Sequence, residues 1–512
     1  MSDAPKPRVI VTTDMEADDM NSVLHLCLYL NELDLEAIVY TASKYHFQGD
    51  GVHTLGQVTP NWSTSGRLAY EGHIGYPHPD PDASALTSYR PFPEGWLESL
   101  WTHEYAQALP HLLSNAPGYP TPEELLARTY RGNVDFEGDV RAATPGSDVI
   151  TRAILDDDPR TLWLLSWGGV NTIVRALMTI AERYQGTPEW ERVQAKVYRK
   201  VRVLGVMDGK GQDNSWKDHG EPIFPELHLM RTEFMYGHYF SARTEQLDCR
   251  HMFQAPWPVE NLIRDNGPLM GRMGLYGDGK VYEGEPERFQ YGKHATLDFG
   301  FDGMEPITFM PFDFMAEGDS MTFIPLLPVG LRGVGPDGTE EPGFETILGR
   351  LWRDGGEPPA KRYDWTVDQV PAEGAGMMPA AGANPAERAF QEEYAARAQW
   401  CAHDWDECNH APVISDVAPD VAAAPGQVVE LFATATDPDG DALRVCWHYD
   451  HLASSYAGTA DNLRAFEPAH LRTRAVVPVD ARRGDRLVWT LEVQDVADRP
   501  LTRYAQVAVT VG

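Results

Sequence analysis

Four carboxylates near the start of the chain are the residues best suited to chemistry. Asp14, Glu16, Asp18 and Asp19 fall within six consecutive positions. Carboxylates crowded this closely repel one another unless a cation neutralises them, and a set of oxygen ligands favours calcium or magnesium. The alternative is an acid-rich helix start without a metal, because the positive end of a helix dipole also stabilises acids. The spacing alone leaves both interpretations open.

The elements around these acids indicate where they lie. Residues 9–11 form an apolar run typical of a buried strand, and residues 20–30 place apolar side chains along one side of a helix. A second strand is predicted at residues 37–41. A strand, a helix and a strand with a short return indicate parallel strands in a sheet covered by helices. The acids then occupy the loop between the first strand and the first helix.

The same pattern recurs further along the chain. Strands are predicted at residues 162–166 and 201–207, and helices are predicted after the cap Ser147 with Asp148 and at residues 171–184. Loops that follow the strands of an open α/β sheet gather at its carboxyl edge, where ligands bind. We therefore expect an α/β domain with an open, mostly parallel sheet, helices on both faces and the acids at that edge.

The chain is predicted to divide into two domains. Residues 1–405 are assigned to the α/β domain, with a polar helix at residues 384–400. Within that domain, residues 45–140 are rich in Pro, His, Trp and Tyr, and we expect an insertion that decorates the substrate side and stays outside the core. In residues 406–512 the apolar period changes to two, which predicts an all-β, immunoglobulin-like sandwich.

Composition restricts the partners. A chain of 512 residues exceeds one ordinary core, and its 42% hydrophobic and 23% charged residues are typical of globular proteins. The formal charge of -33 repels phosphate backbones and anionic lipids, so neither nucleic acid nor membrane is an expected partner. The start resembles no signal peptide, so we expect a cytoplasmic protein if this N-terminus is native, and a periplasmic or secreted one if a leader was trimmed. A homo-oligomer is left open.

The five cysteines do not form the dense framework of a disulfide-stabilised module. Cys401 and Cys408 alternate with His403 and His410, which in principle offers four zinc ligands, although the spacing matches no common zinc motif. We expect most of the thiols to be reduced and buried.

Several short motifs resemble known families. The segment from Thr12 to Asp19 resembles the N-terminal aspartate signature of the nucleoside hydrolases, with Thr12 and Glu16 in place of an Asp and a Gly. A closer resemblance is to the bacterial cellulose-binding-protein family that joins a nucleoside-hydrolase-like domain to a C-terminal sandwich. The stretches that carry it, in order along the chain, are residues 165–169, 266–269, 317–319, 409–412 and 437–441.

The resemblance implies roles for individual residues. Asp14 would bind calcium and act as the base on the attacking water, and Asp19 would be a bidentate calcium ligand. Asp18 would hydrogen-bond a sugar hydroxyl. The backbone carbonyl of Asn171 and the side chain of Asp319 would complete the metal ligands.

Other site residues are predicted from their types and positions. Sugar contacts are expected from Glu16, His46, Trp167, Gln212, Asp213 and Asn214. Trp167 has a packed alternative, and residues 212–214 have a solvated turn as theirs. The candidates for the acid that protonates the leaving group are Glu317, His46 and His53, with Glu317 beside Asp319 taken as the catalytic one.

These residues predict a calcium-dependent hydrolase of glycosyl bonds that acts on saccharides or small O-glycosides. Direct attack by water predicts inversion of configuration. One alternative is an N-ribosyl (nucleoside) hydrolase, and another is a carbohydrate-binding protein without turnover. Residues 437–441, Asp-Pro-Asp-Gly-Asp, are either a second calcium site in the sandwich or an ordinary Asp-Gly turn.

Overall fold

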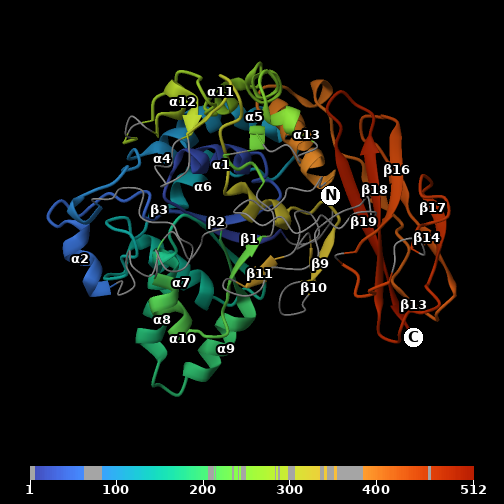
Figure 1. Ribbon diagram of the computed structural model, residues 1–512, viewed down its shortest axis with the longest axis horizontal. Coiled ribbons are helices and arrows are strands. Elements are labelled where there is room, and N and C mark those ends of the chain that lie inside the picture. Colours follow the sequence, from blue (N-terminus) through green and yellow to red (C-terminus); the bar gives the residue numbers. More distant parts are fainter. Residues whose placement is uncertain are drawn as a thin grey trace.

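Figure 1 shows the protein as a computed structural model. The structure describes residues 6–62, 83–205, 213, 215–232, 236–239, 241–243, 249–282, 284–285, 289–297, 306–334, 340–342, 351–353, 385–451, 453–458 and 463–512. Along these residues, no helix is both long enough and apolar enough to cross a bilayer.

A seven-stranded sheet forms the centre of the N-terminal domain, in the order β11-β6-β5-β4-β1-β2-β3. The strands are β1 (Arg8–Thr13), β2 (Asp34–Tyr40), β3 (Thr129–Arg131), β4 (Leu162–Trp167), β5 (Val201–Gly205), β6 (Leu229–Thr232) and β11 (Leu351–Arg353). Neighbours pair in parallel except β11, which is antiparallel to β6. The predicted open, mostly parallel sheet is confirmed. Because β1 lies between β2 and β4, its C-terminal end is central on the carboxyl edge.

Helices cover both faces of the sheet (Figure 1). Those that adjoin β1, β4 and β5 in the sequence are α1 (Ala17–Cys27), α7 (Pro145–Leu155), α8 (Asn171–Tyr184) and α9 (Trp190–Lys200). Strand alternation explains the two layers: on β1, Val9 and Val11 join the core shared with α1, and Ile10 joins the core shared with α7 and α8. All of β1 is buried, as a parallel strand covered on both faces requires.

The helix boundaries follow local chemistry. The predicted helix at residues 171–184 is confirmed as α8. Helix α7 starts earlier than predicted, because Thr144 is its N-cap. The Thr144 side chain accepts from the Ser147 backbone N–H, and the Ser147 side chain accepts from the Thr144 N–H. Ser147 therefore completes a reciprocal cap that begins three residues before it.

Further short elements complete the domain. They are α2 (Leu55–Trp62), α4 (Trp96–Leu100), α5 (Ala106–Asn115), α6 (Pro122–Ala127), α10 (Glu221–Ile223), α11 (Gly267–Gly271), α12 (Tyr291–His294), α13 (Pro385–Gln399), β7 (Thr296–Leu297), β8 (Ile307–Thr308), β9 (Arg332–Val334) and β10 (Glu340–Pro342). Helix α13 corresponds to the predicted polar helix and lies beside the sandwich in Figure 1.

The expectation that residues 45–140 only decorate the substrate side is wrong for their second half. Strand β3 pairs with β2 and forms an edge of the central sheet. Leu97, Trp101 and Tyr105 are buried in the same core as α1. Sequence reasoning missed this because the aromatic residues resemble a binding surface, whereas here they cover apolar area on the sheet.

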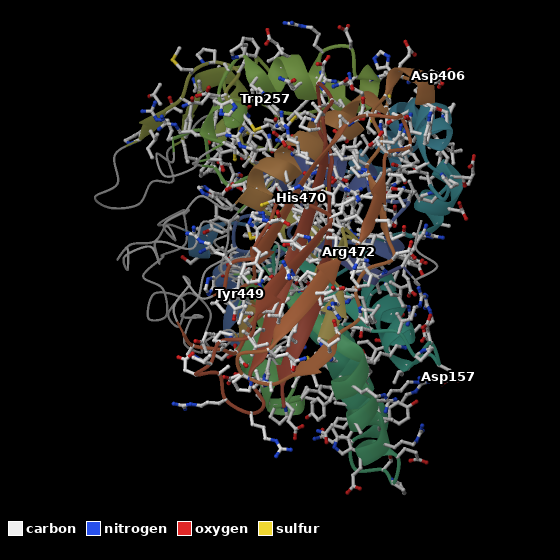
Figure 2. The ribbon with its side chains drawn as sticks, turned by 90° about the vertical axis from the view of Figure 1, so that its right-hand side faces the viewer. Asp157, Trp257, Asp406, Tyr449, His470 and Arg472 are labelled. Carbon is white, nitrogen blue, oxygen red and sulfur yellow. The ribbon has the colours of Figure 1, made fainter. Side chains whose placement is uncertain are left out.

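The C-terminal domain is built of strands and turns, as predicted. Its strands are β12 (Val413–Ser415), β13 (Val421–Ala423), β14 (Val428–Phe432), β15 (Thr434–Thr436), β16 (Leu443–Tyr449), β17 (Arg472–Val476), β18 (Arg486–Asp495) and β19 (Thr502–Val511). The largest sheet has the order β13-β19-β18-β16, and β14 pairs with β17. Leu431, Trp447 and Trp489 meet in a core of their own. Figure 2 views the molecule with this domain toward the reader.

The prediction that most of the cysteine side chains are buried is confirmed. All five cysteines are free, and three of them are buried. The zinc interpretation is wrong: Cys408 contacts the His403 carbonyl, and His410 pairs with Asp439. Within the described ranges, no group of potential metal ligands forms around Cys401.

A buried ion network joins the two domains. The Arg397 guanidinium on α13 pairs with Glu393 Oε1 at 3.0 Å and with Glu32, which follows α1. Glu393 Oε2 also pairs with Arg503 of β19 at 2.9 Å. The Arg397 and Glu393 side chains are 2% and 4% exposed. Charges this deeply buried are stable only while every partner is in place, so the network fixes how the sandwich docks.

Glu392 makes this contact between domains sensitive to pH. Burial raises the pKa of Glu392 to about 7, and Gln494 Nε2 donates to its carboxylate at 3.2 Å. The folded state therefore holds the Glu392 proton more tightly than the unfolded chain, where a Glu titrates near 4.5. The protonated Glu392 therefore contributes to the stability of the folded protein. This contribution is fully present below the pKa that Glu392 has in the unfolded chain, and it is lost as the pH rises through about 7.

We expect Glu392→Gln to stabilise the protein at pH 8, by about 1 kcal/mol after allowance for solvent screening, and to have little effect at pH 4. Thermal unfolding followed by circular dichroism across this pH range measures the difference. The exposed Glu430→Gln is the matched control and should show no pH-dependent gain. A gain for Glu392→Gln that is equal at both pH values would contradict the assignment.

Candidate active site

A cluster of carboxylates lies at the carboxyl edge of the sheet. Asp14 directly follows β1, and Asp18 and Asp19 are in the first turn of α1. Asp319 precedes the short 3-10 helix Ser320–Thr322. Asp18, Asp19 and Asp319 each place one carboxylate oxygen within 4.8 Å of the others. The fold thus joins the acids predicted near residue 14 to the distal aspartate predicted from the resemblance.

Most of the cluster is buried. Asp14 and Asp19 are each 2% exposed, and Asp14 Oδ2 makes no hydrogen bond to any residue that the structure describes. Burial raises the pKa values of Asp14, Asp18, Asp19 and Asp319, and the repulsion among the carboxylates raises them further. Such a site binds either protons or a divalent cation, because uncompensated buried carboxylates are unstable.

Local geometry holds the acidic loop in shape. Met15 adopts a positive φ of 59°, which turns the chain out of β1. Thr13 Oγ1 accepts from the Met15 N–H at 3.0 Å and donates to Asp19. The hydroxyl of the last strand residue therefore fixes the turn and aligns a carboxylate on the helix.

The loop after β4 supports Asp14 from the other side. The Trp167 carbonyl accepts from the Asp14 N–H at 3.1 Å. Gly168 has a φ of +134°, and a Cβ at this position would lie 2.8 Å from Asp14 Cγ. Only glycine permits that backbone and leaves room for the carboxylate.

Asn171 and Asp213 maintain this loop through hydrogen bonds. Asp213 Oδ2 accepts from the Asn171 N–H at 3.0 Å, and Asp213 Oδ1 accepts from the Ser215 N–H at 2.8 Å. Asn171 Oδ1 accepts from Thr41. Asp213 is 3% exposed, so the prediction that it meets a sugar is replaced by a positioning role. Asn171 is the first residue of α8, and its carbonyl as a metal ligand stays a prediction.

A second polar cluster adjoins the acids. His46, Arg90 and Glu285 gather around the Glu16 side chain: Arg90 Nη2 donates to Glu16 Oε1 at 2.9 Å, and Arg90 Nε donates to Glu285 Oε2 at 2.6 Å. Tyr239 extends the polar lining and donates its hydroxyl to Asp18 Oδ1 at 3.0 Å. Sequence reasoning selected Glu16 and His46 and missed Arg90, Glu285 and Tyr239, because no motif marks residues so distant along the chain.

Two predicted sugar or catalytic residues are placed elsewhere. Trp167 is fully buried and donates its ring N–H to Thr322 Oγ1 at 2.7 Å, so its faces pack in the core and the predicted sugar stacking is wrong. Glu317 is also fully buried, and its carboxylate lies 3.0 Å from His25 Nδ1 on α1. A carboxyl group enclosed this way holds a helix in place and has no path to a leaving group.

His53 pairs outside the carboxylate cluster. His53 is half exposed and pairs with Asp50 at 2.7 Å. Gln212 and Asn214 lie outside the described residues. In the sandwich, Asp437, Asp439 and Asp441 place carboxylate oxygens within 4.8 Å of one another, and the second calcium site there stays a prediction.

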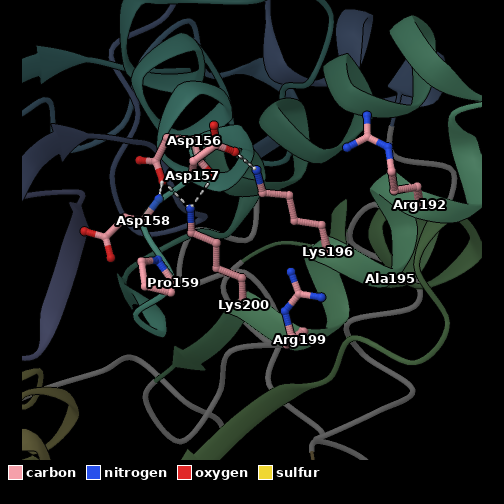
Figure 3. Close-up of a pocket in the computed structure, with 9 residues that line it drawn as sticks. All are labelled: Asp156, Asp157, Asp158, Pro159, Arg192, Ala195, Lys196, Arg199 and Lys200. Carbon is pink, nitrogen blue, oxygen red and sulfur yellow. Dashed lines mark hydrogen bonds and ion pairs between the residues drawn. The ribbon is translucent and has the colours of Figure 1, made fainter.

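A separate cavity of about 440 Å³ lies at the opposite, amino edge of the sheet (Figure 3). It is lined by Asp156, Asp157, Asp158, Pro159, Arg192, Ala195, Lys196, Arg199 and Lys200. Lys196 donates to the Leu155 carbonyl at 2.6 Å, and Lys200 donates to the Asp156 carbonyl at 3.1 Å. These lysines provide hydrogen-bond donors for the free carbonyl groups at the C-terminal end of α7. We therefore interpret the cavity as a structural feature that is separate from the carboxylate cluster.

The sheet, the acidic loop after β1 and the appended sandwich define a nucleoside-hydrolase-like protein with a second, β-rich domain. Residues 8–343 match the family described as cellulose-binding Sde182, nucleoside hydrolase-like domain, and residues 428–511 match cellulose-binding protein Sde0182, C-terminal domain. The chain belongs to this family of cellulose-binding proteins.

Comparison with solved structures agrees on the fold. A nucleoside hydrolase-related hypothetical protein from Saccharophagus degradans, associated with carbohydrate metabolism, is 22% identical with a TM-score of 0.63, over 99% of this chain and 100% of that one. The effector protein XOO4466 is 11% identical with a TM-score of 0.32, over 78% of this chain and 95% of that one, too distant to support an argument. No curated protein matches the chain.

Proposed function

We propose that this protein hydrolyses glycosyl bonds in saccharides or small O-glycosides with one calcium ion in its active site. The proposal is supported chiefly by the cluster at the carboxyl edge, in which carboxylate oxygens of Asp18, Asp19 and Asp319 lie within 4.8 Å of one another. Asp14 adds an Oδ2 that has no hydrogen-bond partner among the described residues. A protein without metal or chemistry at this position would gain stability by replacing such carboxylates.

The residues fit a hard divalent cation. Asp18, Asp19 and Asp319 place carboxylate oxygens, which calcium prefers, within 4.8 Å of one another. Asp19 and Asp319 would hold the ion, and Asp14 would join them as a further ligand. Bound calcium would neutralise the repulsion in the cluster and make an adjacent water more acidic.

The side chains around the cluster suit glycosyl transfer to water. No described residue hydrogen-bonds to Asp14 Oδ2, so this oxygen can accept the proton of a water that attacks the anomeric carbon. Asp18, aligned by the Tyr239 hydroxyl at 3.0 Å, would bind a sugar hydroxyl. The negative charge of the cluster would stabilise the positive charge that develops on the sugar in the transition state.

The second candidate is carbohydrate binding without turnover, which the family description favours. Cleavage of N-ribosides uses the same chemistry, and Thr12 and Glu16 depart from the nucleoside hydrolase signature. Purified protein should therefore be tested on aryl glycosides, oligosaccharides and nucleosides, with and without chelator, beside a cellulose pull-down. Chelator-insensitive saccharide binding with no turnover on any substrate would establish the binding protein and overturn the hydrolase.

Calcium is expected to stabilise the folded protein. An ion that binds only the folded state stabilises it. At a free concentration about one hundred times the dissociation constant, the ion adds about 2.7 kcal/mol to the free energy of unfolding and raises the melting temperature. Differential scanning fluorimetry with calcium and with chelator measures the shift. We expect Asp319→Asn to lose it and the exposed Asp157→Asn to keep it. A shift retained in Asp319→Asn and lost in Asp439→Asn would place the ion in the sandwich instead.

A further inference from the structure

We infer that His46 donates the proton to the leaving oxygen, and that the substrate is accordingly an O-glycoside whose leaving group is an alcohol or a second sugar. This inference rests on the proposed hydrolase function. His46 lies in the loop after β2, and Asp14 directly follows β1. Because β1 and β2 are parallel neighbours, both loops lie at the carboxyl edge of the sheet.

The hydrogen bonds of His46 define its two ring nitrogens. Nδ1 lies 2.6 Å from the Arg90 carbonyl, and a carbonyl only accepts, so Nδ1 carries a hydrogen. Nε2 is buried and makes no hydrogen bond within the described part of the chain. It lies 3.8 Å from both Glu16 Oε2 and Glu285 Oε1. The nitrogen that is free to exchange a proton therefore sits between two carboxylates.

Arg90 fixes these carboxylates in place. Its side chain is 1% exposed, pairs with Glu16 and Glu285 at 2.9 Å and 2.6 Å, and lies 4.2 Å from the centre of the Phe289 ring. One arginine carries one positive charge against the two carboxylates of Glu16 and Glu285, and a proton on His46 Nε2 would supply a second. Burial and the Arg90 charge oppose this protonation, yet Glu16 and Asp14 outweigh them and the pKa of His46 is raised.

Asp14 as the base and His46 as the acid would act together in one site. As water attacks the anomeric carbon, a bond forms between the water oxygen and this carbon, and a proton of the water passes to Asp14. The bond from that carbon to the leaving oxygen breaks, its electron pair stays on the oxygen, and the Nε2 proton of His46 is transferred to it. The products are a free sugar and an alcohol, and exchange with solvent returns both residues to their starting states. An alkoxide leaves poorly without this proton, which is why the geometry favours O-glycosides of alcohols and sugars.

Dependence on the leaving group tests the inference. We expect His46→Gln to lower kcat/KM by about 100-fold or more on the oligosaccharide or alkyl glycoside that the wild type cleaves best. On the dinitrophenyl glycoside of the same sugar, whose leaving group departs unprotonated, the loss should be less than about tenfold. His25→Gln is the matched control, because His25 is a buried histidine in the same domain whose Nδ1 pairs with Glu317 at 3.0 Å. It should show no difference between the two substrates.

Equal losses on the two glycosides in His46→Gln would overturn the role of His46 while leaving the hydrolase function intact. If the Gln variant is unstable by circular dichroism, His46→Asn is measured in the same way. Wild-type protein that cleaves neither glycoside, with or without calcium, would overturn both the proposed function and this inference.

Discussion

Asp14→Asn is expected to lower kcat by at least about 10³-fold on the best glycoside substrate, since it removes both the general base and a metal ligand. The variant should remain folded, because the substitution replaces a buried, repelled carboxylate by a neutral amide of the same shape. Saccharide binding measured by calorimetry should persist, so turnover and binding separate in a single variant.

The matched control for this experiment is Asp157→Asn. Asp157 is fully exposed and pairs with Lys196 at 3.2 Å, at the opposite edge of the sheet. Its kcat should equal that of the wild type. If Asp14→Asn instead retains activity within about tenfold, the attacking water loses its proton to a different group and the assignment of Asp14 as base is wrong.

Arg397→Met is expected to lower the free energy of unfolding by about 3 kcal/mol, because it removes the cation shared by the partly buried Glu32 and the buried Glu393, and leaves Glu393 with Arg503 alone. The Leu28 carbonyl and the Asn31 amide oxygen lose a donor as well, at 3.0 Å and 3.3 Å. Urea denaturation followed by tryptophan fluorescence measures the change. Limited proteolysis should also release the sandwich sooner than in the wild type.

A surface pair provides the comparison for Arg397. Arg472 and Glu430 pair at 3.0 Å on the sandwich, with side chains 67% and 63% exposed. Arg472→Met should therefore change stability by less than about 1 kcal/mol. Similar losses in the two arginine variants would show that burial does not set the strength of the network and that the domains dock by other contacts.

Much of the fold could be predicted from sequence because it depends on local patterns. The apolar run of β1 reports burial on both faces, and the period of 3.6 fixes α8 to its observed bounds. The change to a period of two marks the sandwich, where one face of each strand is buried. The insertion was misjudged because an aromatic residue such as Trp101 has the same sequence signature in a core as on a binding surface.

The candidate site was predictable in part, from the spacing of its N-terminal acids and, for Asp319, from the family resemblance. Asp14, Asp18 and Asp19 are neighbours in sequence, so their repulsion and their position after a strand can be read directly. Trp167 and Glu317 were misassigned because residue type does not tell whether a side chain points into the core or toward the edge of the sheet. Glu317 and Asp319 are two positions apart in one turn. The packing of α1 against this turn decides that Glu317 pairs with His25 and Asp319 joins the carboxylate cluster.

By itself, therefore, the sequence determined the loop of carboxylates after β1, the parallel sheet that carries it and the β-rich domain that follows. Only the tertiary structure brought Arg90 and Glu285 around His46 and Glu16, since these pairings join residues 74 and 195 positions apart in the chain. The physical reason is the range of the interactions. Strand and helix periods act between near neighbours, whereas the charge balance of a buried site depends on whichever side chains folding places within a few ångströms.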